Sequence, residues 1–157
     1  MVQHNPASTL IGMTERAAAK SPRVVAIVDG NAAFDYETLH DAVLRCVAAL
    51  RASGIGKGSR VGYLGLNSID YVILLQAALR IGAVTVAVNW RLVAREVAYI
   101  VKDAQIALLV TESERLAAVG DSAQMVLLVD RPHQDRPAFR DWIAGFAPDD
   151  AVADLEP

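Results

Sequence analysis

Apolar residues recur at helical spacing and in short runs along most of this chain. The clearest helix is predicted over 37–52. One stripe of this segment is apolar: Leu39, Val43, Leu44, Val47 and Leu50. Asp35 is suited to cap the start of this helix, because its carboxylate can accept from the free amides of the first turn. Gly54 suits its end, because glycine adopts the left-handed conformation that closes many helices.

The same patterns predict the remaining elements. Turn residues Asp29-Gly30-Asn31 separate two short strands and indicate a hairpin, and Asn67 or Ser68 and Gly82 bound the helix that follows the next strand. The expected helices cover residues 9–20, 69–80, 93–102, 113–119 and 137–146. The expected strands cover residues 24–28, 33–36, 60–64, 84–88, 106–110 and 125–129.

From residue 37 onward, helices and strands alternate with short connections. Parallel strands require such crossovers, so the alternation predicts an α/β fold: a mostly parallel sheet with helices on both faces. We expect one such domain over residues 1–147. An acidic, flexible tail is expected over 148–157.

Composition adds one open question. The 157 residues are 54% hydrophobic, and the mean hydropathy is +0.30. This is more apolar than is usual for a globular domain. Either the strands are buried on both faces, as in parallel sheets, or part of the surface meets a partner. Both interpretations stay open.

Charge and sequence runs exclude several classes of protein. The 15 basic and 18 acidic residues are mixed along the chain and give a net charge of −3, so no nucleic-acid footprint is expected. No apolar run reaches the roughly 18 residues of a transmembrane helix. The first residues, Met-Val-Gln-His-Asn-Pro, do not resemble a secretory signal. A single cysteine, Cys46, cannot form an internal disulfide, which favours a reducing, cytoplasmic location.

The segment Gly54-Ile55-Gly56-Lys57-Gly58-Ser59 superficially resembles a phosphate-binding loop. Such a loop needs G-x-x-x-x-G-K-[ST] between a strand and a following helix. Here Lys57 is followed by glycine, and the predicted order is helix first and strand second. We therefore interpret the segment as a helix-to-strand turn and expect no nucleotide there.

No other group of residues predicts an active site. His4, His40 and His133 are far apart, none has metal-ligand spacing, and His40 is expected to be solvated at the start of a helix. Cys46 lies between core-facing residues with no partner that would activate it, which favours a structural role. The sequence therefore predicts no catalytic, cofactor-binding or metal-binding residue in this chain.

Two pairs of residues at element ends have competing interpretations. Asp70 is expected to offset a helix dipole, and Tyr71 to begin a buried face completed by Leu74, Leu75 and Leu79. Trp90 and Arg91 follow a strand, at the edge where open α/β sheets bind ligands. Arg91 could hold a carboxylate or phosphate there. The favoured alternative is that Asn89 caps a turn while Arg91 pairs with an acid to fix the next helix.

Several segments in order resemble the AMP-forming acyl-CoA synthetases, the family of the fatty-acid–CoA ligases. The segment 77–92 is similar to the family's helix, apolar strand and Asn-x-Arg-Leu close, with Ala87 where a proline is expected. Residues 34–39 resemble its early aromatic-x-x-Leu element. Residues 50–61 resemble its G-x-x-G-D turn, with Ser59 in place of the acid. The segment 95–103 and the strand at 106 continue a resemblance that covers about 9–129.

This resemblance implies ATP, Mg²⁺ and CoA as cofactors of the complete family, which forms an acyl-AMP and then an acyl-CoA. The family's Pro-Lys-Gly phosphate loop, Tyr-Gly-x-Thr-Glu element, hinge aspartate and C-terminal lysine do not occur in this sequence. The prediction is an incomplete N-terminal part of such a ligase, inactive alone, that pairs with a downstream ligase half. The alternative is a non-catalytic interaction module that pairs with itself or with a full-length ligase.

Overall fold

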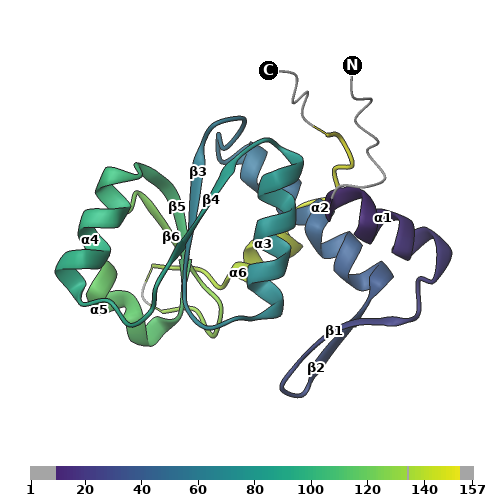
Figure 1. Ribbon diagram of the computed structural model, residues 1–157, viewed down its shortest axis with the longest axis horizontal. Helices are drawn as coiled ribbons and strands as arrows, with labels where there is room; N and C mark the ends of the chain where they lie inside the picture. Colours follow the sequence, from purple (N-terminus) through teal and green to yellow (C-terminus); the bar gives the residue numbers. More distant parts are fainter. Residues whose placement is uncertain (1–9, 134, 153–157) are drawn as a thin grey trace.

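The computed structural model describes residues 10–133 and 135–152, and a parallel sheet between two helical layers forms its larger part (Figure 1). The sheet has the strand order β4-β3-β5-β6, and all neighbouring strands are parallel. Its strands are β3 (Arg60–Leu64), β4 (Val84–Val88), β5 (Ile106–Thr111) and β6 (Met125–Leu128). The predicted α/β fold is confirmed.

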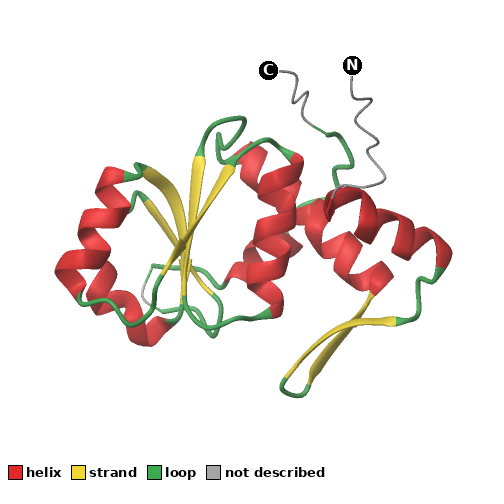
Figure 2. Ribbon diagram, viewed as in Figure 1, coloured by secondary structure: helices red, strands yellow, loops and turns green. Residues whose placement is uncertain are grey.

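Each face of the sheet is covered by helices and has its own apolar core. One core contains residues of α2 (Tyr36–Ala52), α3 (Ile69–Arg80) and α6 (Phe139–Ala144). The other core contains residues of α4 (Ala94–Asp103) and α5 (Leu116–Val119), which is preceded by the short 3₁₀ helix η2 (Ser113–Arg115). Figure 2 shows the two layers on opposite sides of the strands. Burial on both faces explains much of the high apolar content.

A smaller unit precedes the sheet in the chain. Helix α1 (Leu10–Lys20) packs against α2, and β1 (Val25–Asp29) and β2 (Ala32–Asp35) form an antiparallel hairpin, as predicted. In Figure 2 this hairpin lies apart from the main sheet, on the far side of α3. Thr9, where the first helix was expected to begin, lies outside the described residues.

The predicted ends of α2 are confirmed. Thr38 N donates to Asp35 Oδ1 at 2.8 Å, and this hydrogen bond holds the pKa of Asp35 below its usual range. At the other end Gly54 adopts φ 76°, and Ile55 N donates to Leu50 O at 2.9 Å. A glycine is needed there because side chains with a Cβ rarely adopt that conformation.

The predicted buried face of α3 is partly wrong. Leu74 is buried, but Tyr71, Leu75 and Leu79 are only half-buried. Three polar residues are buried instead: Asp70, Gln76 and Arg80. The reason is that α3 packs against the sheet on one side and against α1 and α2 on the other, so polar positions also become enclosed.

The described part of the tail predicted from residue 148 contacts the helical layer. Asp149 N donates to Leu44 O at 3.1 Å, and the Asp149 carboxylate pairs with Arg51. The buried Arg80 donates from Nη2 to Asp150 O at 2.6 Å. The tail thus provides oxygen acceptors for arginines on α2 and α3. Residues 153–157 lie outside the described residues.

None of the helices within 10–133 and 135–152 is both long enough and apolar enough to cross a bilayer.

We predict that the substitution Gly62→Ala in the middle of β3 lowers the free energy of unfolding by about 1–3 kcal/mol, the range for overpacking a core. A Cβ at this position would lie 2.7 Å from Leu109 Cδ1 and 2.9 Å from Ile106 Cδ1, both in the core. Urea denaturation measures the change. Gly56→Ala is the matched control, since nothing lies within 4 Å of a Cβ there. Equal stability of the two variants would contradict the close packing at Gly62.

Candidate functional site

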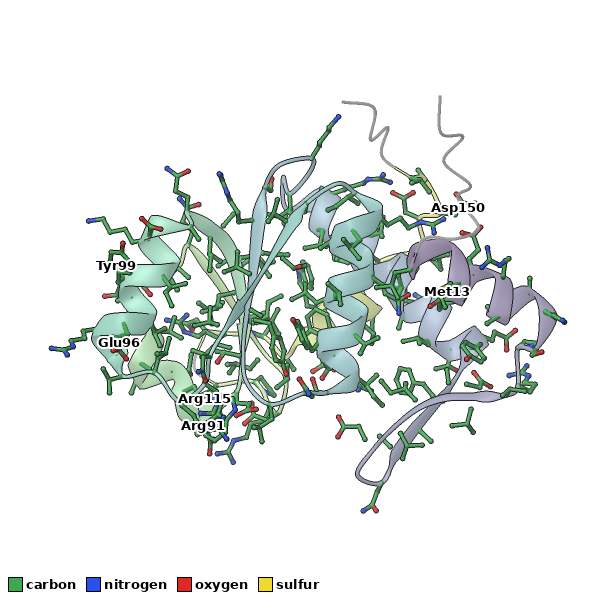
Figure 3. The ribbon with its side chains drawn as sticks, viewed as in Figure 1. Met13, Arg91, Glu96, Tyr99, Arg115 and Asp150 are labelled. Atoms are coloured by element: carbon green, nitrogen blue, oxygen red, sulfur yellow. The ribbon has the colours of Figure 1, made fainter. Side chains whose placement is uncertain are left out.

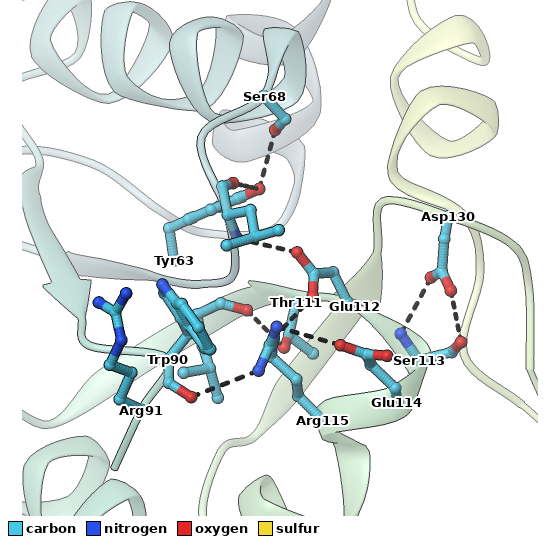
Figure 4. Close-up of polar contacts among 12 residues, drawn as sticks. Tyr63, Ser68, Trp90, Arg91, Thr111, Glu112, Ser113, Glu114, Arg115 and Asp130 are labelled. Carbon is cyan, nitrogen blue, oxygen red and sulfur yellow. Dashed lines mark hydrogen bonds and ion pairs between the residues drawn. The ribbon is translucent and has the colours of Figure 1, made fainter. Parts of the chain in front are cut away.

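The candidate site is the edge of the sheet where the parallel strands end, shown in Figure 4. Ligands of open α/β sheets bind outside the carboxyl ends of the strands. In this chain the segments after β3, β4, β5 and β6 meet at that edge and are joined by a network of polar contacts. The network decides which groups at the edge are available to a ligand.

Tyr63, near the end of β3, fixes the loop that leads into α3. Its hydroxyl donates to Leu66 O at 2.8 Å and lies 2.8 Å from Ser68 Oγ. Its ring stacks on Tyr71 with the centroids 4.4 Å apart. Burial raises the pKa of Tyr63 to about 12, so the hydroxyl stays protonated at neutral pH. Ser68, rather than Asn67, caps α3, because Tyr71 N donates to Ser68 Oγ at 3.1 Å.

Glu112, directly after β5, joins this loop to the next segment. Leu66 N donates to Glu112 Oε1 at 2.8 Å, and Arg115 Nε donates to Glu112 Oε2 at 2.6 Å. Beneath it, Thr111 Oγ1 donates to Leu64 O at 2.7 Å and ties the ends of β5 and β3 together. Both carboxylate oxygens of Glu112 are therefore already engaged.

Trp90 lies between the two arginines of the edge. The guanidinium of Arg91 lies 4.2 Å from the Trp90 ring centroid, and that of Arg115 lies 5.0 Å from it. Arg115 also forms ion pairs with Glu112 and Glu114 and donates to Trp90 O at 3.3 Å. Figure 3 shows Arg91 and Arg115 close together at this edge. Arg115 is neutralised by carboxylates, whereas Arg91 rests on an aromatic face.

The favoured interpretation of Arg91 is half right. Asn89 does cap the turn, since Arg91 N donates to Asn89 Oδ1 at 3.0 Å. However, Arg91 forms no ion pair with any carboxylate in residues 10–133 and 135–152. Glu96 fixes the start of α4 instead, by accepting from Val93 N at 3.1 Å. The Arg91 guanidinium is thus a cation at this edge that no described carboxylate neutralises.

Asp130, which follows β6, accepts hydrogen bonds from the segment that follows β5. Ser113 N donates to Asp130 Oδ1 at 2.9 Å, and Ser113 Oγ donates to Oδ2. Partial burial raises the pKa of Asp130, but these hydrogen bonds outweigh it, and the pKa lies below its usual range. The carboxylate is therefore ionised and locks the segment after β5 to the segment after β6.

Together these contacts tie the edge into a connected polar network, in which Arg115 is paired with carboxylates and Arg91 is not. Transfer chemistry on a triphosphate needs several cations and backbone amides around the phosphates. The described residues of this edge do not provide such a cluster, since Arg115 is paired with two carboxylates. Among the described residues, no three histidine, cysteine or carboxylate side chains gather as metal ligands.

The glycine-rich segment forms the turn predicted for it. It lies between α2 and β3, at the amino end of that strand, with Gly54 and Gly58 at positive φ. Gly58 N donates to Gly82 O at 2.8 Å, which ties it to the turn after α3. The segment is therefore at the opposite end of β3 from the candidate site.

Cys46 and His40 both lie on α2. Cys46 is fully buried, and burial raises the pKa of its thiol, in agreement with a structural role. The expectation that His40 is solvated is wrong. Its Nε2 atom is buried without a hydrogen-bond partner, and burial together with the nearby Arg80 lowers the pKa of His40. His4 lies outside the described residues.

Asp70 has a larger role than the predicted one of offsetting the dipole of α3. It is buried, and its Oδ1 accepts from Arg140 Nε of α6 at 2.6 Å. Arg140 in turn lies over the Phe34 ring, 4.8 Å from its centroid. Burial raises the pKa of Asp70, and the charge and hydrogen bond of Arg140 oppose that rise. The pair joins α3 to α6 and to the hairpin.

Sequence reasoning missed Glu112, Arg115 and Asp130. Each follows a strand, so the rule that pointed to Arg91 could have found them too. The pairing of Asp70 with Arg140, 70 residues apart in the sequence, had no local signal.

Comparison with known proteins agrees with this fold. A model of the AMP-binding enzyme family matches residues 14–153, and the chain belongs to that family. The fatty acid–[acyl-carrier-protein] ligase ScoC of Streptomyces coeruleorubidus is 37% identical over 113 residues, which are 72% of this chain and 22% of that protein. The long-chain-fatty-acid–CoA ligase FadD13 of Mycobacterium tuberculosis is 32% identical over 134 residues, which are 83% of this chain and 25% of that protein.

A solved structure shows the same fold. The anthranilate CoA ligase AuaEII, in complex with anthranoyl-AMP, aligns with a TM-score of 0.85 and 21% identity over 91% of this chain and 29% of that chain. This chain spans about a quarter of the length of the curated relatives it matches, in agreement with the resemblance to an N-terminal part.

We predict that Arg140→Ala lowers the free energy of unfolding by about 1–3 kcal/mol at neutral pH, because it leaves the Asp70 carboxylate buried without its partner. The side chain of Arg140 is 40% exposed, so we expect a smaller loss of stability than for a fully buried ion pair. Loss of the arginine raises the pKa of Asp70 further. Protonation then removes the penalty, so the deficit relative to the parent protein shrinks as the pH falls toward about 4.

Urea denaturation of both proteins across this pH range tests the prediction. Arg95→Ala is the matched control, since Arg95 is exposed on α4. Arg95→Ala should change the free energy of unfolding only slightly, and this change should not depend on pH. A deficit for Arg140→Ala that is constant with pH would show that Asp70 is not the group responsible.

Proposed function

We propose that this chain provides the N-terminal sheet and helices of an ATP-dependent fatty-acid ligase and that it does not activate acids by itself. The observation that carries the proposal is the family match over residues 14–153, on a fold shared with acyl-CoA ligases. The complete reaction would use ATP and Mg²⁺ to form an acyl-AMP, and then a thiol acceptor such as CoA. A fatty acid is favoured as substrate because ScoC and FadD13 are named for fatty acids.

The candidate site supports the absence of independent activity. Of the two arginines beside Trp90, Arg91 stacks on the ring and Arg115 is neutralised by Glu112 and Glu114. A triphosphate and an acyl carboxylate together carry more negative charge than this edge can stabilise. The role that remains for the chain is to form and stabilise one layer of a larger ligase.

Pairing with a downstream ligase half is part of the same proposal. Several large apolar side chains are exposed on the described surface, including Leu10, Met13 and Val24. Such residues are suited to contact with another polypeptide. We also propose a cytoplasmic location, which the single free cysteine, Cys46, supports.

We predict that the purified 157-residue chain shows no fatty-acid-dependent exchange between ATP and pyrophosphate. Exchange should appear when the chain is mixed with a separately produced polypeptide that contains the part of FadD13 following the matched region. That polypeptide alone is the control. Robust exchange by the 157-residue chain alone would contradict the proposal of inactivity. A mixture no more active than the control would contradict pairing with a ligase half.

A further inference from the structure

The sheet has one protected edge and one open edge among the described residues. At the protected edge the segment before α6 contacts β6, where Leu128 N donates to Pro137 O at 3.1 Å. At the other edge β4 pairs only with β3, and the described residues place no strand on its outer side (Figure 2). An uncovered edge strand is a template for pairing with another chain.

The backbone groups available at this edge follow from the alternation of the strand. Val84 N donates to Ser59 O at 2.8 Å and so points toward β3. The N–H and C=O groups of one residue in a strand point to the same side, and successive residues alternate. Thr85 and Ala87 therefore direct their N–H and C=O groups away from β3, at the open edge.

The side chains at this edge do not prevent strand pairing. β4 has the sequence Val-Thr-Val-Ala-Val, with no charged residue and no proline, which are the features that commonly shield edge strands. Val84 is 50% exposed. The apolar surface continues onto α4, because Val86 packs in one cluster with Leu92 and Ile100. These two residues also line a shallow hollow together with Arg95, Glu96 and Tyr99.

We propose that the open edge of β4 binds a second copy of this chain, which adds its own β4 in antiparallel orientation about a twofold axis at Val86. In this register Thr85 of each copy lies opposite Ala87 of the other. Each such pair exchanges both of its N–H···O=C bonds, because these are the residues whose groups face outward. Val84 of each copy then lies opposite Val88 of the other, on the α4 face of the joined sheet.

A second copy suits this edge because the strand is complementary to itself. Identical β4 strands bring no like charges together, and β-branched pairs across the interface are favourable. The axis is perpendicular to the sheet, so α4 of both copies remains on the same face. Arg95 and Glu96 at the rim of the hollow supply opposite charges from each copy, and Figure 3 shows Glu96 and Tyr99 on α4.

The expected association is weak. Pairing along one five-residue strand covers less surface than the roughly 800 Å² per partner of a standard interface. We therefore expect a dimer whose population rises with protein concentration. This inference does not depend on the proposed ligase role, because it uses only the backbone of β4 and its neighbouring side chains.

Sedimentation equilibrium of the 157-residue chain tests the inference. We expect the apparent mass to rise with concentration from 16.8 kDa toward twice that value. Amide hydrogen exchange provides a second, local readout. The N–H groups of Thr85 and Ala87 should exchange more slowly at high protein concentration than at low concentration. A monomer at all concentrations, or exchange at these two amides that does not depend on concentration, would overturn the proposal.

Variants at β4 locate the interface. Ala87→Pro removes an outward N–H and leaves the ladder to β3 intact, a position where proline is tolerated in edge strands. Val84→Lys places a charge on the apolar edge. Each of these two variants should raise the dissociation constant of the dimer about tenfold or more. The circular dichroism spectrum should stay the same as that of the parent protein. The control is Val28→Lys, on β1, where the side chain is 65% exposed. Dimerisation that survives in both folded β4 variants, or that is lost equally in the control, would overturn the proposal.

Discussion

Burial of one parallel sheet on both of its faces is the constraint on which the rest of this structure depends. Parallel strands must be joined by crossovers, so α3 and α4 are placed on opposite faces and each brings an apolar stripe to the sheet. The same constraint brings all carboxyl ends of the strands to one edge. The packing of the core therefore determines where the polar network of Tyr63, Glu112 and Arg115 can form.

The layered arrangement also explains why charged residues are buried in α3. This helix is enclosed between the sheet and the α1–α2 pair, so a polar residue on either flank must find a partner inside the protein. Asp70 pairs with Arg140 on α6. Arg80 pairs with Glu15 and donates to the backbone carbonyl of Asp150. These contacts connect segments far apart in sequence. They join the hairpin unit and the end of the described chain to the sheet.

Local sequence patterns were sufficient for most of the fold. Periodicity placed the helices and strands, and the residues at their ends, Asp35 and Gly54, were identified correctly because capping is decided within a few residues. The partners of Asp70 and Asp149 and the burial of His40 were not predictable in this way, since each is decided by packing between distant segments. The same difference applies at the candidate site. Arg91 could be found from its place after a strand, whereas its stacking on Trp90 in place of an acid could not.

The complete burial of Cys46 has a practical consequence. The thiol lies on α2, in the core that also contains residues of α3 and α6, and it is the chain's single cysteine. A thiol-specific reagent can reach it only when these helices separate, since both burial and the raised pKa suppress reaction in the closed state. The protein thus contains a natural chemical reporter. Its labelling rate measures how often the helical layer opens, and no cysteine has to be introduced for this measurement.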